Sequence, residues 1–467
     1  MRARFVTALA VCGLVAPVAL GATTNDPLLP EQWGLTSARV LDAWDQMPTT
    51  PRDTVVAIID GGVDLVHPDL RDRLWTTSQP IPGPAICGAS AVAAVGSHGY
   101  DLVDCDDRPA AEPVVDGSRP DPGYSHGTKM AGIVGASVNN GIGIAGVNPW
   151  ARIMPIRVCS SAAASCSQLR EIEAVAWAGT AGARVVNMSL GGPTATALGQ
   201  TRLRAAFDAS PNTLFVISAG NEGRDLDDAA GANNAFPCEI PAENVICVAN
   251  LSRTDTLAPS SNYGVLSVDL AAPGTSIATT VPTDALIPNY ATGSGTSEAA
   301  PHVAGVASLL MSAFPDASAA AVKQAILMSA RSLPTLSGQT ATGGALDARA
   351  ALERLRLVSA PTPVPTPAPT PTAGGPPRAG KVARRALGPG RASVAFPLRT
   401  GGALTTWRIL RVGGPSVRQL SAGRRKVPGP ARATLRGRPG QVIAVVLVAT
   451  NASGTLRTSP VRVRLKT

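Results

Sequence analysis

Beyond its first twenty residues, this chain of 467 residues has no apolar run that approaches the roughly 20 residues of a membrane-spanning helix. Its cysteines show no CxxC spacing, and its four histidines do not combine with them into a ligand pattern, which argues against a zinc site. From Lys381 to the end there is no acidic residue, and the aromatic residues there are Phe396 and Trp407. So few aromatic side chains argue against base stacking, and we expect no sequence-specific binding of nucleic acid.

The N-terminus has the composition of a secretion signal. Arg2 and Arg4 precede an apolar run from Phe5 to Leu20, and Gly21 completes a short stretch of small residues suited to cleavage. We therefore assign residues 1–21 to a signal peptide. The mature protein is expected outside the cell, either free or associated with the cell surface.

Cysteine number and spacing predict disulfide bonds. Of the seven cysteines, Cys12 lies in the signal peptide, and the remaining even number suits an oxidising compartment. Six cysteines allow 15 pairings. We favour pairs of neighbours along the chain, since each bond would then staple one surface loop: Cys87 with Cys105, Cys159 with Cys166, and Cys238 with Cys247.

Charge divides the chain into two parts of opposite sign. Residues 381–467 contain 18 of the 41 lysines and arginines, whereas residues 1–380 contain all 32 acidic residues. Between the two parts, every odd-numbered position from Pro361 to Pro371 is proline, which indicates an extended spacer. We expect a large domain over residues 22–357, a Pro/Thr-rich linker over 358–380 and a basic domain after it.

Strands alternate with helices along the large domain. Continuous apolar runs rich in β-branched residues predict buried strands, and segments with helical periodicity separate them. We expect strands over residues 54–59, 152–158, 183–190, 213–218 and 244–249, and helices over 38–44, 168–181, 201–209, 318–328 and 345–356. This alternation predicts an α/β domain with a mainly parallel sheet. Residues 76–123, rich in Pro, Gly and Asp, indicate a partial surface insertion.

The basic region 381–467 contains strand-like runs and is expected to form a small all-β, sandwich-like domain. In the last run, Val461, Val463 and Leu465 alternate with basic residues, which predicts one apolar and one basic face. Such a surface suits an anionic partner such as a cell-surface polymer, lipid headgroups or nucleic acid, of which we favour the cell-surface polymer. The alternative is a basic surface that serves solubility.

The stretch from Gly293 to Gly305, GSGTSEAAPHVAG, sets Ser297 among small residues at the predicted start of a helix. The apolar residues that follow predict a buried helical face. A serine so placed meets the positive end of the helix dipole, which would stabilise an oxyanion formed beside it. Taken alone, the same string is typical of a helix cap in front of a core helix.

Two strings earlier in the chain supply partners for such a serine: VVAIIDGG with Asp60, and SHGTKMAG with His126. A serine nucleophile needs a base to take its proton and a carboxylate to orient that base. In the order Asp, His, Ser, the three strings resemble the signature blocks of the subtilisin-like serine proteases, the subtilase family. From about residue 25 to residue 356, the resemblance implies a subtilisin-like three-layer α/β fold and a serine endopeptidase that acts on extended peptides.

The resemblance also implies a role for each matching residue. Ser297 would attack the scissile carbonyl, His126 would act as general base and then acid, and Asp60 would orient His126. Asn221 matches the family's oxyanion donor, which acts together with the backbone N–H of Ser297. The substrate-binding residues would be Ser189, Leu190, Gly191, Ala219 and Gly220.

Three positions depart from the family pattern. Glu298 replaces a neutral residue after the serine, Gly61 replaces a serine or threonine after the aspartate, and Lys129 stands where histidine is frequent. Glu298 could repel an oxyanion, raise the pKa of His126 or point to solvent. These departures keep an alternative open, in which a weak or inactive subtilase scaffold carries a basic domain that binds an anionic surface.

We expect no cofactor in the chemistry, but the resemblance implies a possible structural calcium ion. The strings HPDL and NNGIGIAGV resemble a calcium site of the family, with Asp69, Asn140 and the carbonyl oxygens of Ile142 and Ile144 as ligands. A glycine-rich loop without an ion is the alternative. We expect a monomer that acts on peptide or protein substrates.

Overall fold

A computed structural model of the chain describes residues 24–111, 122–160, 165–193, 196–227, 235–283 and 289–359, together with strands between residues 378 and 464. The chain divides into two compact units, Met1–Ala360 and Pro361–Thr467. The expected signal peptide and the proline repeat of the linker lie outside the described residues. No helix within the described ranges is long and apolar enough to cross a membrane.

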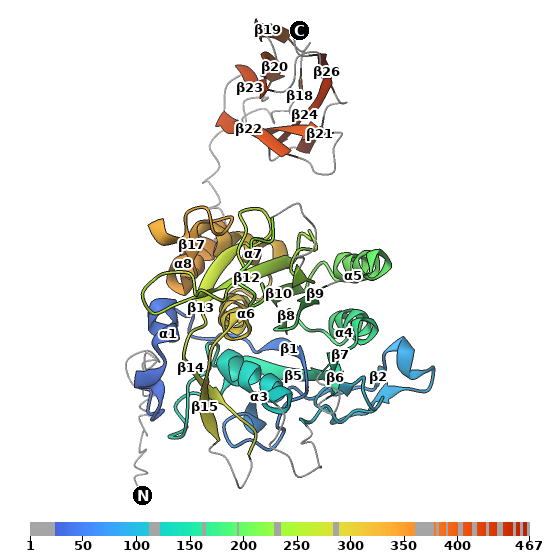
Figure 1. The fold of residues 1–467 in the computed structure, drawn as a ribbon, viewed down its shortest axis with the longest axis vertical. Helices are drawn as coiled ribbons and strands as arrows, with labels where there is room; N and C mark the ends of the chain where they lie inside the picture. The colour runs from blue at the N-terminus through green and yellow to red at the C-terminus, as the bar shows by residue number, and fades with distance from the viewer. Residues whose placement is uncertain are drawn as a thin grey trace, which may run out of the picture. The chain divides into compact units, whose positions relative to one another are not determined.

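A nine-stranded sheet lies at the centre of the first unit (Figure 1). Its strand order is β16-β17-β13-β12-β10-β8-β1-β5-β4, and only β16 pairs antiparallel. The strands are β1 (Thr54–Asp60), β4 (Tyr100–Asp101), β5 (Ala151–Arg157), β8 (Val185–Met188), β10 (Leu214–Ser218), β12 (Val245–Leu251), β13 (Leu270–Pro273), β16 (Arg331–Ser332) and β17 (Gly344–Ala345). The predicted α/β fold with a mainly parallel sheet is confirmed.

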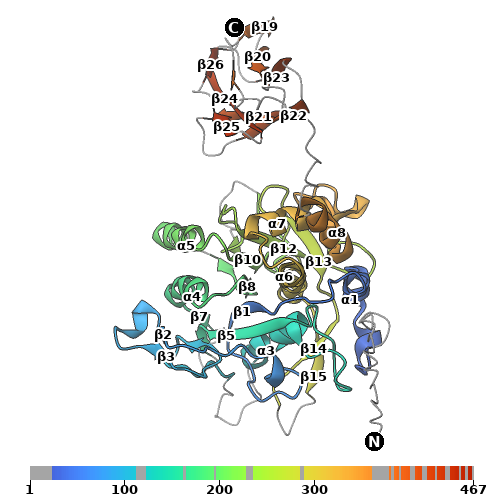
Figure 2. The same ribbon diagram turned by 180° about the vertical axis from the view of Figure 1, so that it is seen from behind.

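Helices cover both faces of this sheet, because successive side chains of a buried strand point to opposite faces. Val56 and Ile58 of β1 belong to one apolar core, whereas Ala57 and Ile59 belong to another. The helices are α1 (Trp33–Ser37), α2 (Val40–Trp44), α3 (Pro122–Gly135), α4 (Gln168–Thr180), α5 (Ala197–Ala209), α6 (Thr296–Ala313), α7 (Ala319–Met328) and α8 (Ala348–Ser359). The first core includes α3, α6, α7 and α8, and the second includes α4 and α5, which lie side by side (Figure 2).

The segment after β1 contributes to the main sheet as well as to the surface. Its strands β2 (Ile81–Pro82) and β3 (Val92–Ala93) pair with each other, and β4 pairs with β5. Tyr100 of β4 is fully buried, with its ring 5.5 Å from that of Trp177. Residues 112–121 of the predicted insertion lie outside the described residues.

Several short elements complete the first unit. They are η2 (Leu29–Glu31), η3 (Arg71–Arg73), η4 (Ala85–Cys87), η5 (Pro334–Leu336), β6 (Cys159–Ser160), β7 (Ser165–Cys166), β9 (Gly192–Pro193), β11 (Ala235–Phe236), β14 (Ile277–Thr280) and β15 (Tyr290–Gly293). Strand β9 pairs with β11, and β14 pairs with β15. Both pairings are antiparallel, and the first joins segments about forty residues apart in the sequence.

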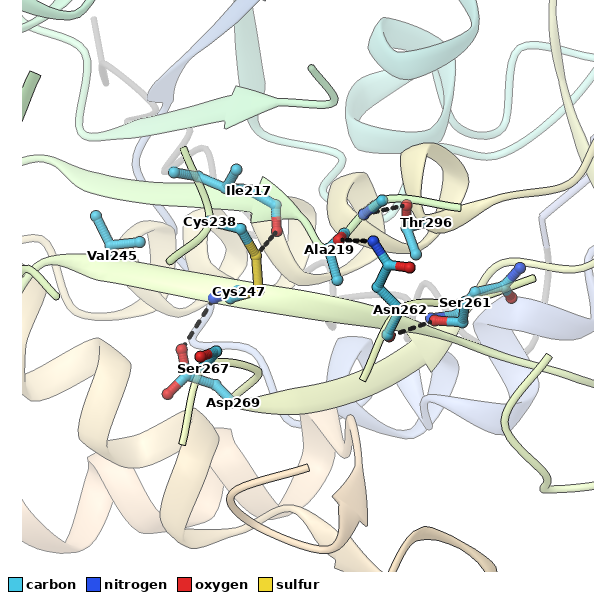
Figure 3. The surroundings of a disulfide bond; sticks show 12 residues. Ile217, Ala219, Cys238, Val245, Cys247, Ser261, Asn262, Ser267, Asp269 and Thr296 are labelled. Atoms are coloured by element: carbon cyan, nitrogen blue, oxygen red, sulfur yellow. Dashed lines mark hydrogen bonds between the residues drawn. A yellow bond between two sulfur atoms is a disulfide. The ribbon is translucent and has the colours of Figure 1, made fainter. Parts of the chain in front are cut away.

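Three disulfide bonds join the six cysteines in the neighbour pairs that the sequence favoured. The bonded cysteines are 18, 7 and 9 residues apart: Cys87–Cys105, Cys159–Cys166 and Cys238–Cys247. The last bond is buried next to the end of β10 (Figure 3). There the backbone N–H of Cys247 donates to Asp269 Oδ2 at 2.9 Å.

Every described element of the second unit is a strand, and the strands form two antiparallel sheets. In the first, β20 (Arg391–Arg399) pairs with β18 (Arg378–Ala379), β19 (Ala383–Gly388) and β23 (Gly429–Arg436). In the second, β24 (Val442–Asn451) pairs with β21 (Thr405–Val412), β25 (Gly454–Arg457) and β26 (Val461–Arg464). Strand β22 (Arg418–Arg425) pairs with β21.

Candidate active site

Three neighbouring parallel strands, β10, β8 and β1, end at the same edge of the main sheet. Asp60 is the last residue of β1, Ser189 follows β8, and Asn221 follows β10 after two intervening residues. Ligand and catalytic groups collect at the carboxyl ends of such strands. The sheet order therefore brings together three of the residues that the sequence singled out.

Asp60 and His126 form a hydrogen-bonded pair. His126 Nδ1 lies 2.8 Å from Asp60 Oδ2 and 3.0 Å from Oδ1. The side chain of Asp60 is 2% exposed, whereas that of His126 remains 27% exposed. Because the carboxylate accepts from Nδ1–H, it selects the tautomer in which Nε2 is free to accept a proton.

Glycine residues on both sides of this pair make it possible. A Cβ at Gly127 would lie 2.2 Å from the carbonyl oxygen of Gly62 and 3.1 Å from Asp60 Cβ, so a larger residue would push α3 away from β1. The backbone N–H of Gly61 donates to Asp60 Oδ1 at 2.7 Å. This bond holds the carboxylate although the hydroxyl usual at position 61 in the family is absent.

Ser297 is the second residue of α6, at the helix start that the sequence predicted. It is half-buried between the buried residues Thr296 and Glu298. Its Oγ donates to the carbonyl oxygen of Ser189 at 3.5 Å, and the hydrogen bonds of the described residues include none between His126 and Ser297. The hydroxyl therefore rests against the segment after β8.

Because α6 contains Pro301, the backbone carbonyl of Ser297 is bonded to the segment after β8 instead of to its own helix. In a regular helix the N–H of residue 301 would donate to the carbonyl oxygen of Ser297, but Pro301 has no N–H. Ser189 Oγ donates to this carbonyl at 2.8 Å instead, and Asn187 Nδ2 donates to Ser189 Oγ at 3.0 Å. The first turn of α6 is thus held from β8.

The loop after β10 is bonded to the residue before Ser297. Thr296 donates to Asn221 Oδ1 from its backbone N–H at 2.8 Å and from Oγ1 at 3.2 Å. Because a backbone N–H can only donate, the amide oxygen of Asn221 faces Thr296, and Nδ2 is the atom left to donate to a substrate. Gly220 has φ +94°, and a Cβ there would lie 2.5 Å from Asn262 Nδ2, so this turn requires glycine.

Asn262 is a site residue that the sequence analysis missed. It is 1% exposed, and its Nδ2 donates to the carbonyl oxygen of Ala219 at 2.9 Å (Figure 3). The same Nδ2 donates to Glu222 Oε2 at 2.6 Å. Its Oδ1 accepts from the backbone N–H groups of Glu222 and Arg224. These bonds fix the loop that carries Asn221. No local pattern signals this role, because the bonds join segments about forty residues apart.

The predicted substrate-binding residues surround this edge of the sheet with different exposures. Leu190 is 8% exposed and Gly191 is exposed, whereas Ala219 is fully buried. Gly192 and Pro193 pair with residues 235–236. The chain after β8 thus continues into a short antiparallel ribbon next to the candidate site.

Comparison with known proteins decides the family. A model described as the subtilase family matches residues 51–351, which include Asp60, His126, Asn221 and Ser297. The chain belongs to the subtilase family. An extracellular protease from Xanthomonas campestris pv. campestris is 34% identical over 352 residues, which cover 71% of this chain and 57% of the relative. Thermitase from Thermoactinomyces vulgaris is 35% identical over 295 residues, which cover 62% of this chain and 86% of thermitase.

A solved structure is similar as well. The structure is titled as proteases from Pseudoalteromonas arctica PAMC 21717. The match covers 72% of this subtilase and 100% of the solved chain, with a TM-score of 0.55 and 28% sequence identity. The subtilase spans 57% of the length of the Xanthomonas protease and 49% of that of the extracellular basic protease of Dichelobacter nodosus. Three of these relatives are thus named as proteases, and two of them as extracellular.

Glu298 of this subtilase is buried next to Ser297. It is 5% exposed, so the expectation that it might point to solvent is wrong. Its carboxylate packs against the backbone of the preceding turn, where a Cβ at Gly293 would lie 2.1 Å from Glu298 Oε1. Burial raises the pKa of Glu298, and the nearby charges of His126 and Lys129 lower it in part.

The pKa of His126 reflects the same group of charges. Burial lowers this pKa, but the negative charge and hydrogen bond of Asp60, together with the charge of Glu298, outweigh burial and raise it above the usual value. Lys129 acts in the opposite direction. Of the three effects considered for Glu298, raising the pKa of His126 agrees with the position of this carboxylate.

Two other histidines, His302 and His67, are buried in the first unit. His302 in α6 is 2% exposed and donates from Nδ1 to the carbonyl oxygen of Glu298 at 2.9 Å. Burial lowers its pKa to about 4, so it is neutral at pH 7. His67 contacts the carbonyl oxygen of Asn289 through Nε2 and accepts the backbone N–H of Asp69 at Nδ1.

The predicted calcium ligands Asp69 and Asn140 lie together, but protein donors occupy their oxygen atoms. The carboxylate of Asp69 accepts from Asn140 Nδ2 at 2.7 Å, from the backbone N–H of Ile144 at 3.2 Å and from the Tyr290 hydroxyl at 3.3 Å. Asn140 Oδ1 accepts the backbone N–H of Ile142 at 3.1 Å. Burial raises the pKa of Asp69 to about 6.

In this arrangement the side chains of Asp69 and Asn140 bond to protein donors and do not supply the six to eight oxygen ligands that a calcium ion needs. Asn140 presents its amide nitrogen, rather than its oxygen, to the carboxylate, and the ring of Tyr290 lies where a Cβ at Gly143 would be 2.1 Å away. Among the described residues, no group of three or more His, Cys, Asp or Glu side chains is placed to hold a metal ion.

Proposed function

We propose that this subtilase is a secreted serine endopeptidase that hydrolyses peptide bonds through an acyl-enzyme on Ser297. The observation that carries the proposal is the Asp60–His126 pair, bonded at 2.8 Å at the sheet edge where the loop of Asn221 is bonded to the residue before Ser297. A base, its orienting carboxylate, an amide donor and a serine at a helix N-terminus are the groups that acyl transfer requires.

In the first half of the reaction, Ser297 Oγ attacks the carbonyl carbon of the scissile bond and its proton passes to His126 Nε2. Substrate binding would draw the hydroxyl from the carbonyl of Ser189 toward the imidazole, since catalytic hydrogen bonds tighten when substrate binds. Asp60 stabilises the imidazolium that forms. Asn221 Nδ2 and the backbone N–H of Ser297, which lies in the first turn of α6, donate to the oxyanion.

In the second half, the tetrahedral intermediate collapses, and the C–N bond breaks as His126 gives its proton to the leaving amine. Water then attacks the acyl-enzyme, with His126 again taking a proton, and the second collapse returns the hydrogen to Ser297. No cofactor enters these steps. An extended peptide would lie along Ser189 to Gly191, with the side chain before the cleaved bond near Ala219 and Gly220.

Secretion is part of the proposal. It is supported by the signal-like residues 1–21, by three disulfide bonds and by the relatives named as extracellular. The basic region 381–467 would then hold the protease at an anionic cell-surface polymer.

Labelling with a fluorophosphonate tests the chemistry. The purified protein is expected to be modified at Ser297, and Ser297→Ala is expected to lose both the label and peptide cleavage. Ser294→Ala, three residues earlier and exposed, serves as the matched control and should label like the parent. Absence of labelling at every pH in the folded protein would favour the alternative of an inactive scaffold.

A further inference from the structure

The register of the strands in the second unit assigns each of their residues to one face of a sheet. Residues directly opposite in an antiparallel pair share a face, and alternate residues of one strand share a face. In the sheet around β20, Phe396 and Leu435 are 0% and 1% exposed, whereas Thr434 is exposed. The face of Thr434 is therefore the outer face of this sheet.

Arginines gather on this outer face. Thr434 is opposite Ser393, and from that pair the register places six arginines on the same face: Arg378, Arg385, Arg391, Arg399, Arg432 and Arg436. We call this set the arginine face. The opposite face has Val394, Phe396, Leu398 and Leu435, and a single arginine, Arg384.

The second sheet repeats this separation in part. Val463 is 4% exposed and the adjacent Arg464 is exposed. The register places Arg408, Arg424, Arg457 and Arg462 on the face of Arg464. Arg411, Arg418 and Arg425 lie on the opposite face, so the separation of basic from apolar residues is incomplete in this sheet.

Within the arginine face, the register pairs arginines directly across neighbouring strands. Arg391 pairs with Arg436, and Arg378 pairs with Arg399. Residues so paired have Cα atoms about 4.5–5.5 Å apart, and like charges there are destabilising. The second unit has no aspartate or glutamate to offset this repulsion. An anion from outside the chain would relieve it.

The chemistry of the cations favours phosphate. Of the 18 basic residues after residue 380, 15 are arginines, whose planar guanidinium groups bind oxyanions in a bidentate manner and suit phosphate better than lysine does. The tetrahedral oxygens of one phosphate can accept from two guanidinium groups at once, whereas one guanidinium already satisfies the two oxygens of a carboxylate.

The dimensions of the arginine face favour a polymer. At about 3.4 Å per residue, Arg391 and Arg399 stand about 27 Å apart along β20, with further arginines on both neighbouring strands. We infer that the arginine face binds a linear, phosphate-bearing polymer of the cell surface and thereby retains the subtilase there. The cellular source rests on the secretion proposed above, but the binding does not depend on hydrolysis.

Binding can be measured on the full-length chain with Ser297→Ala, which prevents self-cleavage. The probe is fluorescent long-chain polyphosphate, titrated by anisotropy at several salt concentrations. Arg391→Ser, Arg399→Ser and Arg436→Ser combined should weaken binding at least about tenfold and reduce the salt dependence, the slope of log K against log salt, by about 2. The matched control removes three exposed arginines of the first unit, Arg52, Arg71 and Arg202, and should bind within about twofold of the parent.

A second variant keeps the proposal testable if the serine variant unfolds. Replacing the same three arginines by lysine preserves charge and should still weaken polyphosphate binding severalfold, because the bidentate geometry is lost. Polyphosphate should also raise the unfolding temperature of the parent more than that of either variant.

Several results would overturn the inference. One is an equal loss of binding in the control triple variant, which would show that only total charge matters. Another is equally tight binding of polyglutamate of the same length, and a third is binding to phosphatidylglycerol vesicles or duplex DNA without binding to polyphosphate. Peptide cleavage, measured with Ser297 intact, should be the same in all the arginine variants, so that failure of polymer binding and failure of the proposed hydrolysis remain distinct.

Discussion

At the scale of single residues, Glu298 is expected to shift the pH at which His126 can act as the general base. Its negative charge contributes to raising the pKa of His126, so a higher pH is needed to remove the proton from Nε2. Glu298→Gln should therefore lower the pKa of His126 and move the acidic limb of kcat/KM to lower pH. Glu353→Gln, exposed and located in α8, is the control and should leave the profile unchanged. An unmoved limb in Glu298→Gln would show that this carboxyl is already neutral where His126 titrates.

Asn262 acts through the loop that carries the candidate oxyanion donor. Asn221→Ala should lower kcat by about 10²- to 10³-fold, the size known for such a donor in subtilisin. Asn262→Ala should lower kcat at least about tenfold with little change in KM, since it releases Ala219 and Glu222 without touching substrate. Asn221 and Asn262 both act through the position of the oxyanion donor, so the loss of kcat in the double variant should be smaller than the product of the two single losses. A loss equal to that product would contradict a shared role.

His302 links stability to pH. Its pKa is lowered from the usual 6.5 to about 4, so the unfolded chain binds a proton that the folded chain does not bind between these values. The unfolding free energy should therefore fall as pH drops from 7 to 4.5, and this residue accounts for about 2 kcal/mol of the fall. Denaturant titrations should show a shallower pH dependence for His302→Gln.

At the scale of elements, the loop around Asp69 is predicted to be held by side chains rather than by an ion. A chelator should leave the unfolding temperature unchanged. Tyr290→Phe, which removes one donor to Asp69, should lower stability by about 1 kcal/mol, whereas Tyr263→Phe should not. A marked loss of stability in the chelator, reversed by calcium, would contradict this prediction.

The sequence predicts those elements whose burial and chemistry are local. Strands β1, β5, β10 and β12 are continuous apolar runs, and α6 begins where small residues give way to a helical apolar pattern. Strand β13, Leu270–Pro273, is four residues long and contains proline, so no run marks it. Its place in the sheet comes from pairing with β12.

The candidate site divides in the same way. Asp60, His126, Asn221 and Ser297 lie in strings with a recognisable order, so they could be predicted. Asn262 and Tyr290 act through contacts with segments 38 to 221 residues away, and neither lies in a local pattern. The burial of Glu298 likewise depends on the turn at Gly293 that packs over it.

At the scale of the whole molecule, the two proposed functions fall on separate units. The described residues of the candidate site all lie in the first unit, and the arginine face lies in the second. Deleting residues 381–467 should therefore leave kcat/KM for a short peptide unchanged within about twofold, because no catalytic group is removed. The same deletion should release the secreted protease from cells into the medium. A large loss of peptide cleavage would show that the second unit supports the first.

In the proposed endopeptidase, Pro301 would couple substrate binding to the position of the nucleophile. The carbonyl oxygen of Ser297 accepts a hydrogen bond from the Ser189 hydroxyl at 2.8 Å instead of one from its own helix. A displacement of the proposed substrate-binding segment, residues 189–191, would therefore be transmitted to Ser297 through this bond. A peptide bound out of register that displaces this segment would also move Ser297 away from the position needed for attack. Selectivity among substrates would then act at the cleavage step as well as at binding.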